Sequence, residues 1–186
     1  KFLTVMADVS NEEAVKGYVN ATVKEFGKID GFYNNAGIEG KQAPLTEYDV
    51  NVFKKVVDIN LMGVYYGLRY VIPVMQKNGG GRIVNVASVG GIRGVLNQTP
   101  YVATKHAVAG MSKNAALEYG RYGILTNAIA PGAIKTPMVA EAFREVNPDN
   151  PQAAEDEYAS RNPTKKLGKS SDVASLVAFL LSDQNG

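Results

Sequence analysis

The sequence predicts an α/β fold in which helices cover both faces of a doubly wound parallel sheet, giving three layers. Apolar runs of strand length alternate along the chain with longer stretches of helical periodicity. Parallel strands need crossovers of helix length, and those helices must cover the faces of the sheet. A chain of 186 residues has the size of one domain that buries its own core. We therefore interpret residues 1–186 as a single domain.

Four segments have strand character, and polar or glycine-containing turns follow them. The predicted strands are residues 2–7, 31–34, 82–87 and 124–130. In an open α/β sheet, ligands bind beyond the carboxyl ends of the strands. We therefore expect the binding site among the residues that follow these strands, which are Asp8, the segment Asn34 to Gly37, Ser88, Pro131 and Gly132.

Helical periodicity is clearest in two long segments, 49–76 and 100–119. Two shorter helices flank them, and we expect Ser10 to cap the first of these and Ser171 to cap the last helix of the chain. The polar, proline-interrupted stretch 139–168 predicts a lid with short helices that closes over a substrate.

Composition excludes several classes of function. The net charge of +2 is small and the basic residues are scattered, so neither nucleic acid nor a membrane is expected as a partner. The chain has no cysteine and only one histidine, His106, so we expect no disulfide, no thiolate chemistry and no metal. No apolar run approaches the length of about 20 residues needed to span a bilayer. These features are typical of a cytoplasmic domain that works through oxygen groups, lysine or a bound cofactor.

Tyr101 and Lys105 are the first candidates for catalysis. Four residues apart on a helix, they share one face and can meet the same ligand. An ammonium beside a phenol lowers the pKa of the phenol, as acid–base catalysis on an alcohol or ketone requires. A simple surface contact remains the alternative, because the chain contains 10 tyrosines. Ser88, just beyond a strand, adds a hydroxyl that can polarise a carbonyl or, alternatively, bind its own backbone.

The order of these motifs resembles the short-chain dehydrogenase/reductase superfamily over essentially the whole chain. The matching residues are Asn34-Asn35-Ala36-Gly37, Asn60, Ser88, Tyr101 with Lys105, and Pro131-Gly132. The resemblance implies an NAD(P)-binding domain of the Rossmann type. It also implies an oxidoreductase that transfers hydride between NAD(P)(H) and a secondary alcohol or its ketone.

The resemblance gives each catalytic candidate a role. Tyr101 would exchange the proton with the substrate oxygen, and Ser88 would polarise the carbonyl. Lys105 would bind the nicotinamide ribose and lower the pKa of Tyr101. Asn60 would hold a water in a proton relay through Lys105. An asparagine inside a long helix also disfavours the helix locally and often marks a bend.

The resemblance also implies a set of cofactor contacts. Asp8 and Val9 would contact the adenine, although Asp8 also suits a turn or a helix cap. The other expected contacts, besides Tyr101 and Lys105, are Asn35, Ala36, Gly37, Pro131, Gly132, Ile134 and Thr136. The resemblance favours NAD over NADP, but the residue that distinguishes them lies on a family strand that has no counterpart in this sequence.

The substrate wall and the assembly follow from the same comparison. We expect Val95, Leu96 and Met138, with Ser88, to line a site for a small or cyclic alcohol and ketone. The helices at 49–76 and 100–119 carry small residues, including Gly63 and Gly67. In the family such helices form a four-helix dimer interface, so the resemblance implies a homotetramer.

Parts of the family pattern are missing from these residues. The phosphate-binding glycine loop is absent, and the pattern corresponds to the family fold without its first two strands and its last strand. We therefore expect the 186 residues to be part of a longer polypeptide. The alternatives are a non-catalytic dinucleotide-binding or degenerate dehydrogenase-like protein, and a nucleotide-sugar epimerase with the same tyrosine–lysine pair.

Overall fold

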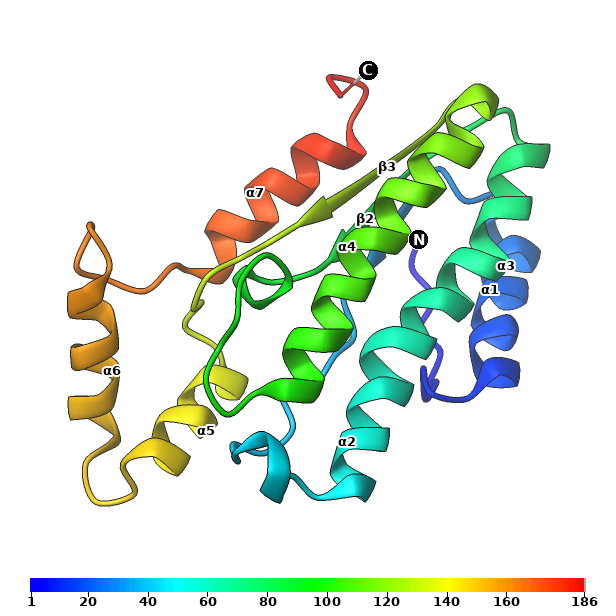
Figure 1. Ribbon diagram of the computed structural model, residues 1–186. Coiled ribbons are helices and arrows are strands. Elements are labelled where there is room, and N and C mark those ends of the chain that lie inside the picture. Colours follow the sequence, from blue (N-terminus) through cyan, green and yellow to red (C-terminus); the bar gives the residue numbers. More distant parts are fainter. Residues whose placement is uncertain (186) are drawn as a thin grey trace.

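A computed structural model describes residues 1–185, and its centre is a three-stranded parallel sheet (Figure 1). The strands are β1 (Gly31–Asn34), β2 (Gly81–Val86) and β3 (Ile124–Ile129), and they lie in the order β1-β2-β3. The long helices are α1 (Glu12–Phe26), α2 (Val50–Val57), α3 (Gly63–Lys77), α4 (Thr99–Tyr119) and α7 (Ser170–Leu181). The predicted α/β fold with a parallel sheet is thus confirmed.

The sheet lies between two helical layers, with α3 and α4 on one face and α7 on the other (Figure 1). Successive residues of β2 point to opposite faces of the sheet and pack against the helices on each face. Ile83 packs into the larger core with α3 and α4, while Val84 packs with Val177 of α7. Near-continuous apolar strands of this kind are typical of parallel sheets that are buried on both faces.

Residues 2–7 do not form the predicted strand. They are exposed, and no ladder joins them to the sheet. The apolar run predicted a buried strand, but a strand needs a neighbour for its backbone N–H and C=O groups. The segment instead ends against the start of α3, where a side chain on Gly63 would lie 2.9 Å from Val9 Cγ2.

Two of the predicted helix caps were also wrong. The N-cap of α1 is Asn11, whose side chain accepts from the Ala14 N–H at 3.1 Å, rather than Ser10. The N-cap of α7 is Lys169, whose backbone N–H donates to Asp172 at 2.8 Å, rather than Ser171. Asn11 thus satisfies a free amide in the first turn of α1, whereas the start of α7 has no side-chain cap bond to the helix and Asp172 instead accepts from the N-cap backbone.

The segment predicted as one helix from 49 to 76 is interrupted. A π-helical turn over Asp58–Met62 separates α2 from α3, and Asn60 lies in its middle. Such π-bulges are rare and recur at functional sites. Asn60 therefore marks a local irregularity in the hydrogen-bond pattern of the segment, which remains helical throughout.

The segment between β3 and α7 contains the two short helices that the sequence predicted for 139–168. They are α5 (Pro137–Val146) and α6 (Pro151–Arg161), which pack through Phe143 and Tyr158 with ring centroids 5.8 Å apart. A single parallel bridge between Ile134 and Gly168 closes the base of this excursion. The two helices thus form a small substructure, and the Ile134–Gly168 bridge closes its base.

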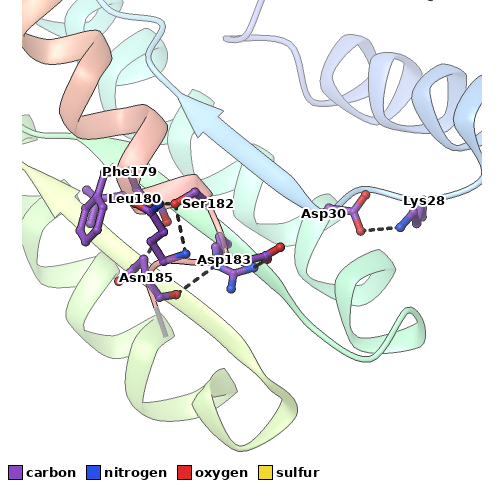
Figure 2. A network of polar contacts seen from close by, with 9 residues as sticks. Lys28, Asp30, Phe179, Leu180, Ser182, Asp183 and Asn185 are labelled. Carbon is purple, nitrogen blue, oxygen red and sulfur yellow. Dashed lines mark hydrogen bonds and ion pairs between the residues drawn. The ribbon is translucent and has the colours of Figure 1, made fainter.

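Polar contacts fix the chain after α7 to the start of the sheet (Figure 2). Arg82 of β2 donates from Nε to the backbone oxygen of Asn185 at 3.1 Å and pairs with Asp183 at 3.1 Å. Lys28 and Asp30 form a second pair, at 2.9 Å, just before β1. All these contacts lie at the amino ends of the strands, and those of Arg82 hold the end of α7 against the sheet while leaving the carboxyl ends open.

Candidate active site

A cavity of about 800 Å³ lies at the carboxyl ends of the strands, where the fold class predicts the site. Residues that follow all three strands line it, together with residues of α4, α5 and α7. The site residues predicted from the sequence that line this cavity are Asn35, Ala36, Gly37, Ser88, Tyr101, Lys105, Pro131, Gly132, Ile134, Thr136 and Met138. The structure therefore brings most of the predicted residues to one place.

Tyr101 and Lys105 share the face of α4 that borders the cavity. Lys105 Nζ lies 5.6 Å from the centroid of the Tyr101 ring and donates to the backbone oxygen of Val86 at 2.8 Å. Lys105 is 4% exposed. The surface-contact alternative is therefore wrong, because the ammonium is buried beside the phenol rather than in solvent.

Burial dominates the acid–base properties of this pair. Burial raises the pKa of Tyr101, and a hydrogen bond with Ser88 opposes that shift. Burial also lowers the pKa of Lys105 from 10.5 to about 8. Lys105 is not among the causes of the Tyr101 shift, and removal of the two groups from water dominates both pKa values, so the predicted lowering of the Tyr101 pKa by Lys105 stays a prediction.

Ser88 makes the local backbone contact that was one of its two expected roles and also lines the cavity, while its role at a carbonyl stays a prediction. Its Oγ accepts from the Gly90 N–H at 3.1 Å, which is the local backbone contact. The same hydroxyl interacts with the Tyr101 phenol and lines the cavity. The backbone contact fixes the rotamer of Ser88, so the hydroxyl is held in place beside Tyr101.

Asn60 lies behind the cavity rather than in its lining. It is fully buried, and its amide holds Ile38 from both sides: Oδ1 accepts from the Ile38 N–H at 2.8 Å, and Nδ2 donates to the Ile38 oxygen at 2.7 Å. A side chain on Gly37 would lie 3.3 Å from Asn60 Oδ1 and 3.5 Å from Lys105 Nζ. Asn60 and Lys105 therefore face the same glycine.

Two predicted adenine contacts lie outside the cavity lining. The Asp8 carboxylate accepts from the Ser10 N–H at 2.9 Å and from the Ser10 hydroxyl at 2.7 Å, and these bonds lower the pKa of Asp8. This is the turn geometry that was the alternative for Asp8. Val9 packs on Gly63. Their contact with a cofactor stays a prediction.

The predicted substrate wall is only partly assembled. Met138 lines the cavity, whereas Val95 and Leu96 do not. Leu96 is 85% exposed, so it contacts a substrate only if its loop closes over the cavity. The role of both loop residues remains a prediction.

Sequence reasoning missed the wall that α7 supplies. Val173, Ala174, Val177 and Ala178 line the cavity, and their spacing puts them on one helical face. It also missed Glu39, a half-buried carboxyl whose charge influences Tyr101. Its position two residues beyond Gly37, after a strand end, was the available signal.

Two other features are absent from residues 1–185. The described residues contain no group of three or more histidine, cysteine, aspartate or glutamate side chains placed to hold a metal ion. Within the same range no helix has the length and apolar character required to cross a membrane.

Comparison with known sequences identifies the relatives of this chain. A family model described as enoyl-(acyl carrier protein) reductase matches residues 1–186. Levodione reductase of Leifsonia aquatica is 55% identical over 181 residues, which are 97% of this chain and 68% of the relative. Cyclohexanol dehydrogenase of Acinetobacter sp. (strain SE19) is 41% identical over 177 residues, 95% of this chain and 66% of the relative. The chain thus spans about two thirds of these curated relatives.

Solved structures agree with the sequence comparison. The crystal structure of levodione reductase matches with a TM-score of 0.96 and 54% identity, over 98% of this chain and 70% of that chain. The structure of NAD⁺-bound xylitol dehydrogenase matches with a TM-score of 0.90 and 34% identity, over 96% and 72%. Together with the motifs at the strand ends, these matches confirm the predicted Rossmann-type fold, and the chain belongs to the short-chain dehydrogenase/reductase family.

Proposed function

We propose that the protein interconverts a secondary alcohol and its ketone by hydride transfer to and from a nicotinamide dinucleotide. The observation that carries this proposal is the shared position of Tyr101, Lys105 and Ser88 on one cavity at the strand ends. The three side chains combine a proton donor, a cation and a fixed hydroxyl, which suit general acid–base chemistry at a carbonyl oxygen.

The cavity fits the nicotinamide part of such a cofactor. Its volume of about 800 Å³ lies within the usual range of ligand sites. Lys105 donates one of its three ammonium protons to Val86, so the other two remain for ribose hydroxyls. Pro131, Gly132, Ile134 and Thr136 would hold the nicotinamide, and Asn35 to Gly37 the adenosine side. When bound, the cofactor supplies or accepts the hydride.

The residues of the chain then perform the proton chemistry. In ketone reduction, Tyr101 donates its phenolic proton to the substrate oxygen while the Ser88 hydroxyl donates a hydrogen bond to that oxygen. In alcohol oxidation, the Tyr101 phenolate accepts the proton. Lys105 stabilises the phenolate by its charge, and Asn60 fixes the backbone at Ile38 and holds a relay water between itself and Lys105.

The cofactor is proposed to be NAD or NADP. The solved relative xylitol dehydrogenase has NAD⁺ bound, which supports a dinucleotide of this kind. The resemblance favours NAD. NAD and NADP differ at the 2′ position of the adenosine ribose. Among residues 1–185, no acidic or basic side chain is assigned to contact that position.

We propose a cyclic secondary alcohol and its ketone as the substrate class. Two similar proteins are named levodione reductase and cyclohexanol dehydrogenase, and the cavity wall contributed by Met138 and α7 is mainly apolar. We further propose that the helical segment 139–168 acts as a lid for a single catalytic domain, and that the protein works in the cytoplasm.

A homotetramer is the proposed assembly. A groove of about 480 Å³ lies between α3 and α4 and includes Leu68, Ile72 and Met111. Gly63 and Gly67 face inward, against Val9 and Phe32, so the exposed residues of this groove, such as Tyr65 and Arg69, would contact a second copy rather than those glycines. Light scattering of the purified protein tests the proposal: a tetramer supports it, and a monomer at all concentrations contradicts it.

A direct assay tests the function. Protein expressed from its complete reading frame is mixed with NADH or NADPH and a panel of cyclic ketones, including levodione and cyclohexanone, and cofactor absorbance is followed. Loss of absorbance that depends on both enzyme and ketone supports the proposal. Dinucleotide binding without turnover of any ketone or alcohol supports the non-catalytic alternative.

A further inference from the structure

The loop that follows β1 is attached to the start of α4 by two contacts. Glu39 accepts a hydrogen bond from the side-chain amide of Gln98, and the Ala43 N–H donates to the Asn97 oxygen at 3.0 Å. Gln98 is the N-cap of α4, and its side chain makes no bond to the helix it caps. The amide is instead used to hold the loop.

The chain entering α4 makes a left-handed turn. Asn97 has a positive φ of 62°, a conformation that is uncommon for residues other than glycine and in which asparagine is enriched. The Val102 N–H then donates to the Gln98 oxygen at 2.9 Å, forming the first turn of the helix. Tyr101 lies in that turn, so the position of its ring depends on how Asn97 and Gln98 are held.

The opposite side of the loop is fixed as well. Asn60 holds Ile38 through two hydrogen bonds, and the Lys41 N–H donates to the Tyr48 hydroxyl at 3.0 Å. Glu39 lies between these two points. Its carboxyl is therefore held by the loop on one side and by Gln98 on the other, so it cannot move freely into solvent.

Glu39 also lies among acidic groups. Burial and the charge of Glu145 on α5 raise its pKa to about 7. Its own charge in turn raises the pKa of Tyr48 and of Tyr101. Glu145, Tyr48 and Tyr101 are the ionisable groups that interact with Glu39 from the elements packed around it.

We propose that Glu39 is a positioning residue for Tyr101: its carboxylate accepts from Gln98 and so fixes the first turn of α4, which carries the Tyr101 phenol. The inference rests on the proposed acid–base role of Tyr101. A negative charge on the loop that contacts α4 also disfavours a phenolate at Tyr101, so we expect ketone reduction to persist to higher pH than in a variant without this charge.

Two variants separate the two parts of the proposal. Glu39→Gln removes the charge but keeps an amide that can bond to Gln98. Gln98→Ala removes the bond but keeps the charge. Glu141→Gln is the matched control, because Glu141 is an exposed acid on α5 that pairs with Arg144. Each variant is made in the protein expressed from its complete reading frame.

The charge is tested by pH–rate profiles of alcohol oxidation and ketone reduction. In the Glu39→Gln variant, the rate of alcohol oxidation should begin to rise at a pH about half a unit lower than in the parent. This shift is the effect expected from one partly screened charge several ångströms away. Glu141→Gln should leave the profile in place. A Glu39→Gln profile that coincides with that of the parent overturns the electrostatic part.

The hydrogen bond is tested by hydrogen exchange at the Val102 amide. Gln98→Ala should accelerate this exchange at least fivefold, while exchange in α7 stays unchanged, and should lower kcat more than it changes KM. Unchanged exchange at Val102 overturns the positioning part. This measurement needs no turnover. A parent enzyme inactive on every ketone would refute the proposed function, and exchange would still decide the positioning claim.

Discussion

Asn60 binds both backbone groups of Ile38, accepting from its N–H at 2.8 Å and donating to its oxygen at 2.7 Å. Asn60 lies in a π-helical turn and is fully buried. The irregular turn places the amide where a regular helix would not, and the loop after β1 takes its position from it. This one contact connects the helix interruption to the cavity.

Replacement of Asn60 by alanine should destabilise the protein. It leaves the Ile38 N–H and oxygen without partners in a buried site, and we expect a loss of about 3 kcal/mol in the free energy of unfolding. Urea denaturation measures this. Asn20→Ala is the control, because Asn20 is exposed on α1 and lies outside the proposed interface groove, and it should change stability by less than about 0.5 kcal/mol. Equal effects of the two variants would contradict this account.

Gly91 is predicted to be required for the position of Lys105. A side chain on Gly91 would lie 2.6 Å from the backbone oxygen of Lys105, so Gly91→Ala must push the loop away from α4. We expect a loss of about 1–3 kcal/mol in stability. At Gly94 an added side chain meets nothing within 4 Å, so Gly94→Ala should have little effect. Thermal unfolding of both variants checks this, and a stable Gly91→Ala protein would refute it.

Lys105 should make the stability depend on pH above neutrality. Its pKa falls from 10.5 to about 8 on folding, so between these values the unfolded chain binds more protons than the folded one. Stability contributed by this group therefore rises with pH through that window. Below about pH 8 the buried ammonium costs about 3 kcal/mol relative to a lysine in water.

Lys105→Met removes this cost. We expect the variant without cofactor to be more stable than the parent at pH 7, and the difference to shrink as the pH approaches 10. Urea denaturation at both values measures it, at pH 7 and pH 10 under the same salt. A difference that stays constant between the two pH values would contradict the assignment of a depressed Lys105 pKa.

The sequence alone predicted the features that depend only on residues close together in the chain. Strand ends followed by Gly37, Ser88 and Gly132 predicted the edge of the sheet at which the cavity lies, and the spacing of Tyr101 and Lys105 predicted that they share a face. These features depend on alternation and helical periodicity, which are properties of short segments.

Features that depend on distant neighbours were not predictable. Residues 2–7 have strand composition, but strand formation needs a partner that the segment does not contact. The raised pKa of Tyr101 depends on burial by the assembled cavity, and the interaction of Glu39 with Gln98 joins two loops. The π-turn at Asn60 likewise reflects the bond to Ile38, which no local pattern reveals.

Proton transfer by Tyr101 is the central claim, and Tyr101→Phe tests it most directly. The variant keeps the ring beside Lys105 and removes only the hydroxyl. In the protein expressed from its complete reading frame, kcat for ketone reduction should fall by at least about 100-fold, while the dissociation constant for the dinucleotide stays within a few fold. Turnover within a few fold of the parent would contradict the account.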